Sequence, residues 1–231
     1  MVSLQKNKKL DFITENIQQI RQNLPANITL IAVSKFKPIT AIAEAYQAGQ
    51  RDFGENRTQE LAEKHPQLPA DIRWHFIGHL QTNKVKYIAP FVHLVHSVDS
   101  GRLLEEINEQ GKKNNRVIDC LLQFYIAREE SKFGFSITEA ENMLQSSAFQ
   151  QFKNIRLCGV MGMATFTDNQ AQIRQEFQTL KQYFDRLKET YFAHQQHFNE
   201  ISMGMTDDYL LAIAEGSTMV RIGSAIFGGR V

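Results

Sequence analysis

The chain has few cysteines, no excess of charge of either sign and no long apolar segment. Only two of its 231 residues are cysteines, Cys120 and Cys158, which lie far apart and form no C-x-x-C pair. Both lie in apolar runs, so we expect buried free thiols in a reducing compartment. Lys and Arg number 26 and Asp and Glu 25. The formal charge of +1 therefore gives no general attraction to nucleic acid or to an acidic membrane.

Membrane-spanning and secretory segments are also missing. No stretch approaches the ~18 apolar residues that a membrane-spanning helix needs. The first 24 residues contain no uninterrupted apolar segment of the kind found in a signal peptide. Instead, apolar residues recur there at spacings of three and four, which predicts an amphipathic helix packed on a core: Leu10, Ile13, Ile17, Ile20 and Leu24. We therefore expect a cytoplasmic protein.

Strand-like and helix-like segments alternate along the rest of the chain. Residues 28–35 form a compact apolar and β-branched run, typical of a buried parallel strand. Pro38 suits the first turn of a helix that runs to Gly49. Further strands are predicted at Asp52–Asn56, Arg73–Gly78, His93–Asp99, Val117–Tyr125, Ile155–Met163, Glu200–Met205 and Met219–Ile222. Helices are expected near 57–64, 81–89, 100–111, 137–148, 169–192 and 207–215, with Gly111 and Gly216 ending two of them.

Strict alternation of strands and helices predicts parallel strands joined by right-handed crossovers. Eight such units in 231 residues match the size of a (β/α)8 TIM barrel, an α/β fold. A doubly wound open sheet is the alternative, and it is disfavoured because no G-x-G-x-x-G follows the first strand. No Pro-, Gly- or Ser-rich linker divides the chain, so we expect one domain over residues 1–231 with an additional N-terminal helix.

In such a barrel the functional groups lie at the carboxyl ends of the strands. Lys35 closes the first strand, where burial can lower the pKa of an amine and leave it nucleophilic. The alternatives are a rim lysine that extends into solvent, and Lys37 as the reactive amine. Gly223 and Ser224 follow the last strand, where backbone N–H groups and a hydroxyl can bind phosphate, although a simple tight turn is an equal alternative. An amine opposite a phosphate site suggests a phosphorylated carbonyl compound held as an imine.

The histidines do not suggest a metal site. His75 is expected to be a satisfied core histidine and His79 a loop histidine. His93 and His96 lie three apart on a predicted strand, so we expect them to face opposite sides. We expect no bound metal.

Short motifs recur over nearly the whole chain, in order. They are Ala32-Val-Ser-Lys35, Phe53-Gly-Glu-Asn56, Trp74-His-Phe-Ile-Gly78 with Leu80-Gln-Thr-Asn-Lys84, Ser131-Lys-Phe-Gly134, Ile201-Ser-Met-Gly-Met205 with Asp207-Asp208, and Gly216-Ser-Thr218 through Val220-Arg-Ile-Gly223 to Ile226-Phe-Gly228. This set closely resembles the YggS/PROSC family, the pyridoxal phosphate homeostasis proteins. The resemblance implies one barrel like the N-terminal domain of alanine racemase.

The resemblance also implies the cofactor and its site. Pyridoxal 5′-phosphate (PLP) would be bound as an imine to Lys35, with Arg221 facing the pyridine nitrogen. Asn56 would flank the ring near its hydroxyl, and Met203 would line the same side. Ser202, Gly223 and Ser224 would bind the phosphate. No catalytic residue is implied.

The expected function follows from the same resemblance. It implies a carrier or regulator in intracellular vitamin B6 homeostasis and amino-acid balance, without established turnover. PLP-dependent apo-enzymes are the candidate partners. We expect a monomer, because the second domain that forms the racemase dimer interface is missing. Arginine has only donors, so Arg221 can bond the ring nitrogen only while that nitrogen is unprotonated and a poorer electron sink. An amino-acid racemase is the alternative, but it needs a second acid–base group opposite Lys35. In the two-domain racemase a second domain supplies that group, and the barrel expected here takes up nearly all 231 residues. A Schiff-base aldolase, with the phosphate on its substrate, is the third hypothesis.

Overall fold

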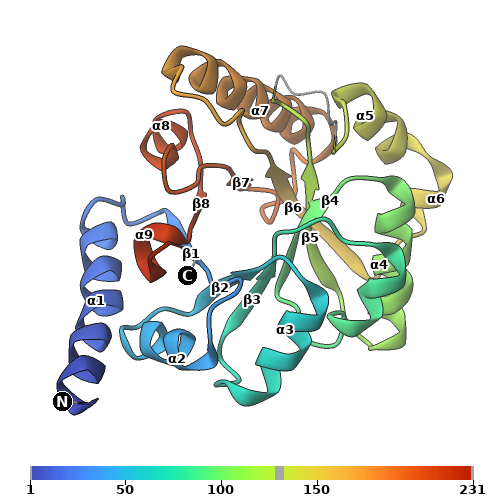
Figure 1. Cartoon of the computed structure of the whole chain (residues 1–231). Helices are drawn as coiled ribbons and strands as arrows, with labels where there is room; N and C mark the ends of the chain where they lie inside the picture. The colour runs from blue at the N-terminus through green and yellow to red at the C-terminus, as the bar shows by residue number, and fades with distance from the viewer. Residues whose placement is uncertain (1, 128–132, 230–231) are drawn as a thin grey trace.

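A closed barrel of eight parallel strands forms the centre of the protein (Figure 1). The computed structural model describes the backbone of residues 2–127 and 133–229, and side chains within these ranges from residue 12. The strands are β1 (Thr29–Val33), β2 (Asp52–Glu55), β3 (Arg73–Phe76), β4 (Leu94–Val98), β5 (Ile118–Gln123), β6 (Ile155–Met161), β7 (Glu200–Ser202) and β8 (Met219–Ile222). Pairing of β8 with β1, from Thr29 opposite Met219 to Ala32 opposite Ile222, closes the barrel. The predicted barrel is confirmed, and the open sheet is excluded.

Helices surround the barrel (Figure 1). Within the described ranges they are α1 (Val2–Gln22), α2 (Ile39–Gln47), α3 (Thr58–Lys64), α4 (Gly101–Lys113), α5 (Ile137–Gln145), α6 (Ser147–Gln150), α7 (Gln170–Tyr191), α8 (Tyr209–Ala214) and α9 (Ser224–Phe227). Two 3₁₀ helices, η1 (His65–Gln67) and η2 (Thr82–Tyr87), complete the set. The helix expected near 81–89 is therefore a 3₁₀ helix. None of the helices in these ranges is long and apolar enough to cross a bilayer.

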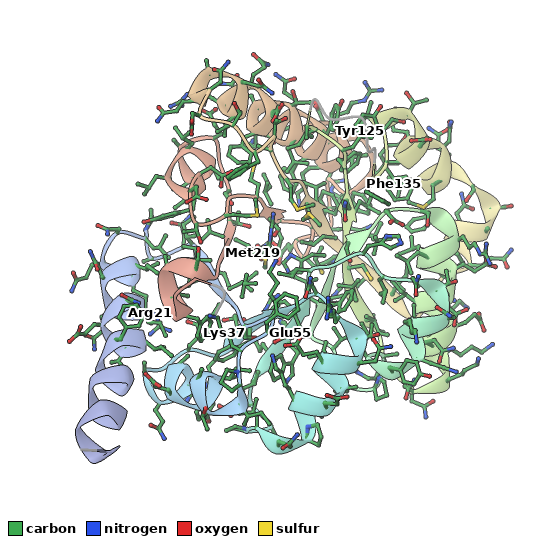
Figure 2. The ribbon with its side chains drawn as sticks, in the orientation of Figure 1. Arg21, Lys37, Glu55, Tyr125, Phe135 and Met219 are labelled. Carbon is green, nitrogen blue, oxygen red and sulfur yellow. The ribbon has the colours of Figure 1, made fainter. Side chains whose placement is uncertain are left out.

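Two apolar layers hold the barrel together. The strand residues that point inward form a small cluster: Ile31, Leu94, Leu121, Cys158, Met161 and Met219. Met219 lies near the middle of the barrel in Figure 2. A larger layer fills the space between strands and helices and includes Phe53, Trp74 and Phe177. Successive residues along a strand belong to the two layers in turn, so Ile31 points inward and Ala32 points outward.

The N-terminal helix packs on this outer layer, as its spacing predicts. Ile13, Ile17 and Ile20 are buried on one face of α1. Asn16 Nδ2 donates a hydrogen bond to the carbonyl oxygen of Ile226 at 3.0 Å. This bond ties α1 to α9, the last helix, which lies beside it in Figure 1.

Two local predictions need correction. Gly111 does not end α4, because the helix continues to Lys113. A Cβ on Gly111 would lie 2.5 Å from the carbonyl oxygen of Asn154, so the glycine serves a close helix–loop contact instead. His93 and His96 do not face opposite sides. His93 lies just before β4, so the alternation of side chains along a strand does not apply to it. The rings of His93 and His96 both lie against the His75 ring, with centroid distances of 5.4 and 5.1 Å.

Candidate functional site

Lys35 lies in the turn that follows β1, at the carboxyl end of the barrel. Phe36, the next residue, has a φ of 62°, a left-handed conformation that is uncommon for a side chain of this size. Lys35 is half-buried. Over residues 12–127 and 133–229, no hydrogen bond or ion pair is recorded for its amino group. The amine is therefore available to a ligand at the mouth of the barrel.

A buried ion-pair cluster clamps the backbone on both sides of Lys35. Lys64 Nζ, on α3, donates to Glu55 Oε1 at 2.7 Å, to Glu60 Oε1 at 2.6 Å and to the carbonyl oxygen of Ser34 at 2.9 Å. The Phe36 N–H donates to Glu60 at 2.7 Å, and the Ser34 hydroxyl donates to Glu55 at 2.6 Å. Burial raises the pKa of Glu55, and Lys64 partly offsets this rise. The cluster fixes the turn that presents the amine.

Sequence reasoning missed this clamp. Glu55 belongs to one of the motifs, but no role was assigned to it, and Lys64 was not singled out. A carboxylate at the end of a short predicted strand was the available signal, since such a residue needs a partner when the strand is buried. Only the fold shows that this partner comes from the next helix.

Lys37, the competing amine, is already engaged. Its Nζ donates to the carbonyl oxygens of Phe227, Gly228 and Gly229 at 3.1, 3.0 and 3.1 Å. Lys37 points toward the end of α9 (Figure 2) and satisfies the carbonyls that a helix leaves unpaired. The geometry thus favours Lys35 over Lys37 as the free amine.

The loops after β7 and β8 meet beside α9. The Ser224 hydroxyl is 3.2 Å from the Thr206 hydroxyl, which sequence reasoning did not single out. A Cβ on Gly223 would lie 3.3 Å from both the Cβ and the carbonyl oxygen of Val33, so a glycine fits most easily against the end of β1. The first N–H groups of a helix have no partner within it. Two hydroxyls and these N–H groups can together bind a phosphate.

Arg221 is buried inside the barrel below this mouth. Its Nη1 donates to Ser202 Oγ at 2.6 Å, and its Nη2 donates to the carbonyl oxygen of Gly162 at 3.0 Å. Burial lowers the pKa of Arg221 to about 10, against the opposing influence of Asp208. The guanidinium therefore stays charged at neutral pH and keeps further donors for a ligand.

Asn56, just after β2, has a buried side-chain oxygen, Oδ1, without a hydrogen-bond partner. Gly78 packs closely against Asn56, and a Cβ added to Gly78 would lie only 2.4 Å from the Asn56 carbonyl oxygen. An unpartnered buried oxygen is costly, and a hydroxyl of a bound ligand would satisfy it. This atom fits the predicted neighbour of the cofactor ring hydroxyl.

Ser202 and Met203 are not exposed at the mouth. Both are 0% exposed. The Ser202 hydroxyl is bonded to Arg221 and lies 2.9 Å from His96 Nδ1, inside the barrel. Met203 belongs to the outer apolar layer. Their predicted contacts with the phosphate and the ring remain predictions.

Ser131 and Lys132, part of one motif, lie outside the described residues. Among the residues that are described, no three His, Cys, Asp or Glu side chains are grouped so as to hold a metal ion. Lys35, Asn56, Arg221, Gly223 and Ser224 are contributed by the ends of β1, β2 and β8 and their loops. Since β1 pairs with both β2 and β8, these ends are neighbours.

Comparison with known proteins places the sequence among proteins named for PLP. Residues 9–231 match the family model of the alanine racemase N-terminal domain. The chain is 40% identical over 206 residues to the pyridoxal phosphate homeostasis protein of Haemophilus influenzae, covering 88% of this chain and 85% of that protein. It is 37% identical to the protein of the same name from Escherichia coli K12, covering 94% and 97%.

Solved structures agree with the sequence relationship. PipY of Synechococcus elongatus, solved with PLP bound, has a TM-score of 0.84 at 34% identity, covering 94% of this chain and all of that chain. The same protein without PLP has a TM-score of 0.87. Alanine racemase of Clostridium difficile shares the fold, with a TM-score of 0.73 at 16% identity, and this chain covers 56% of its length.

Proposed function

Because this chain belongs to the family of pyridoxal phosphate homeostasis proteins, we propose that it binds PLP at the mouth of the barrel and acts in intracellular vitamin B6 homeostasis and amino-acid balance. The observation that carries the proposal is the relative PipY, which has the same fold, 34% identity and bound PLP. The cofactor supplies an aldehyde that an amine can capture and a phosphate that needs several donors.

The residues at the mouth suit each part of this cofactor. We assign the covalent attachment, an imine, to Lys35, whose neighbours in the chain are clamped while its own amine is unoccupied. Arg221 is a charged donor for the pyridine nitrogen, and Asn56 Oδ1 is an acceptor for the ring hydroxyl. Gly223 and Ser224 are assigned to the phosphate, and Thr206 joins them because its hydroxyl meets that of Ser224.

The role that we propose is carriage and buffering of the cofactor, not turnover of a substrate. An arginine at the pyridine nitrogen favours the unprotonated ring, which stabilises a carbanion less well than a pyridinium does. Racemisation also needs acid–base groups on both faces of the substrate carbon. The relatives' names, which refer to homeostasis, support the same role.

Delivery to PLP-dependent apo-enzymes is the partner interaction that we propose. Large apolar side chains are exposed on loops that follow β1, β5, β6 and β7 at the mouth: Phe36 (46%), Phe133 (58%), Met163 (42%), Phe166 (87%) and Met205 (36%). Exposed apolar residues around a site are typical of protein contacts. We propose a monomeric carrier, since a closed barrel offers no sheet edge for pairing. Free, buried Cys120 and Cys158 support a reducing, cytoplasmic location.

Borohydride trapping tests the attachment directly. The purified protein is saturated with PLP, its visible spectrum is recorded, and the bound cofactor is reduced and located by peptide mapping. The reduced adduct is expected on the peptide that contains Lys35, and it should be lost in Lys35→Ala. Lys37→Gln is the matched control, since Lys37 lies two residues away and should leave the adduct in place. An adduct that persists in Lys35→Ala would move the attachment elsewhere, and no cofactor binding by the wild type would refute the function.

A further inference from the structure

A chain of side-chain hydrogen bonds runs through the barrel from its amino end to Arg221. Asp52 on β2 is 3.0 Å from His75 Nε2 on β3, and His75 Nδ1 is 2.9 Å from His96 Nε2 on β4. His96 Nδ1 is 2.9 Å from Ser202 Oγ on β7, and Ser202 Oγ accepts from Arg221 Nη1 on β8 at 2.6 Å. Five strands each contribute one member to this chain.

Every member is buried, so water has little access to its hydrogen bonds. Asp52 is 8% exposed, and the other four residues are between 0 and 4% exposed. A buried donor or acceptor without a partner costs free energy, so the proton positions must satisfy all members together. That requirement determines the direction of each bond.

The direction is set at the Asp52 end. Burial raises the pKa of Asp52, but hydrogen bonds from His75 and Arg73 outweigh this and hold the pKa well below its ordinary value. Asp52 is therefore a carboxylate that only accepts, and His75 must donate from Nε2. Burial also holds the pKa of His96 well below its ordinary value, so His96 is neutral, with one donor and one acceptor nitrogen.

Two arrangements remain for the middle of the chain. If His75 carried a second proton on Nδ1, His96 would accept at Nε2 and donate from Nδ1. Ser202 would then accept from both His96 and Arg221, and its own hydroxyl hydrogen would have no recorded partner. If instead His75 accepts at Nδ1, His96 donates from Nε2 and accepts from the Ser202 hydroxyl. Only this second arrangement satisfies every donor in the chain.

We propose that Asp52, His75, His96 and Ser202 form a hydrogen-bonded relay that orients Arg221 toward the cofactor ring. Every hydrogen bond of this relay is donated in the same direction, from Arg221 toward Asp52. In this relay Ser202 gives its hydrogen to His96 and keeps only lone pairs for Arg221. These four are positioning residues, because they act through Arg221. This role of Ser202 is additional to the phosphate contact expected from the sequence, which remains a prediction. The influence on the cofactor rests on the proposed function, whereas the proton positions do not.

Other charged and titratable groups surround the relay and form the background for any pH measurement. They are Arg73 on β3, His93 before β4, Asp119 on β5, Arg156 on β6 and Asp208 before α8. His93 contacts the His75 ring but is exposed and has no recorded bond within the relay. It therefore provides a matched control.

Histidine NMR tests the relay without any cofactor. The full chain is labelled with ¹⁵N-histidine, and the ring nitrogens are read at pH 7, with His75→Gln and His96→Gln used for assignment. Both rings are expected to be neutral and protonated at Nε2. A proton on Nδ1 of either ring would overturn the proposed polarity.

A second measurement tests the influence on PLP. Ser202→Ala is expected to weaken PLP binding about tenfold and to shift the pH profile of the visible band, because Arg221 loses a partner. Ser202→Thr, which keeps a hydroxyl, should restore both, and His93→Gln should match the wild type. If Ser202→Ala keeps the wild-type profile, the relay does not act on the cofactor. If the wild type itself binds no PLP, the proposed function fails, while the NMR result still decides the relay.

Discussion

Polar side chains have different surroundings at the two ends of the barrel. At the amino end, Arg73 pairs with Asp52 and Arg156 pairs with Asp119, both at 2.6 Å. A cavity of about 300 Å³ lies there, but its arginine, Arg21, is already bonded to the Ala48 and Gly49 carbonyls and to Gln50. At the carboxyl end, Lys35 has no recorded partner among the described residues, and Asn56 Oδ1 is buried without one.

This contrast shows why volume alone does not locate the site. The amino end has a cavity, but the polar groups there satisfy one another, so a ligand would gain little. The mouth at the carboxyl end has an unoccupied amine, an unpartnered oxygen and apolar side chains left in water. A ligand that supplies the missing partners is stabilised at this end.

The largest expected effect is the loss of the clamp under Lys35. Lys64→Met would leave the buried Glu55 and the half-buried Glu60 without their shared cation. Breaking a buried pair in this way typically costs about 3–5 kcal/mol of unfolding free energy. Urea denaturation measures this loss.

An exposed pair of the same spacing provides the control. Lys181 and Asp185 form an i,i+4 pair on α7, as Glu60 and Lys64 do on α3. Lys181→Met should cost less than about 0.5 kcal/mol, because solvent screens the pair. Equal losses in the two variants would mean that the clamp is not a buried structural element.

Gly223→Val tests the phosphate end of the mouth. Its side chain would press on Val33 and obstruct the approach of a phosphate. Loss of charge-assisted hydrogen bonds predicts a Kd for PLP that is about 100-fold weaker in a folded protein. Gly229→Val is the control, since a Cβ there meets no atom within 4 Å. Unchanged affinity in Gly223→Val, measured by titration of the visible band, would exclude this phosphate site.

The buried His96 should make stability depend on pH. Burial keeps the folded pKa of His96 well below its ordinary value, so only the unfolded chain takes up this proton below pH ~6.5. The unfolding free energy should therefore fall as the pH falls from 7 to 5, by up to about 1.4 kcal/mol per pH unit from this residue. His96→Leu should lack that share of the slope in urea denaturation series. Equal slopes would show that His96 does not contribute.

The barrel was predictable because its signals are local. The apolar run before Lys35, the spacing within α7 and the regular alternation of strands and helices each lie in a short segment. Lys35 itself was identified from its place at the end of a strand. The prediction that Gly111 ends a helix was wrong, because the role of this glycine is a close contact with Asn154, and that contact depends on tertiary packing.

The relay and the clamp could not be predicted, because they depend on distant residues. His96 and Ser202 are 106 positions apart and meet only because barrel closure brings residues of β4 and β7 together in its interior. His75 was expected to be a satisfied core histidine, and it is, but its partners could not be named. The motif that contains Ser202 implied a phosphate contact, which remains a prediction, but it gave no sign of the bond that the Ser202 hydroxyl accepts from Arg221 inside the barrel.

The central claim is that the mouth holds PLP without turning over amino acids, and the formation of D-amino acids tests it most directly. The holo-protein is incubated with L-alanine and other L-amino acids, and the D-isomers are measured by chiral chromatography. With only one positioned acid–base group, the rate should stay near that of free PLP, because a second group is typically worth ~10²–10⁴ in rate. Turnover far above free PLP that disappears in Lys35→Ala would contradict the carrier and identify a racemase.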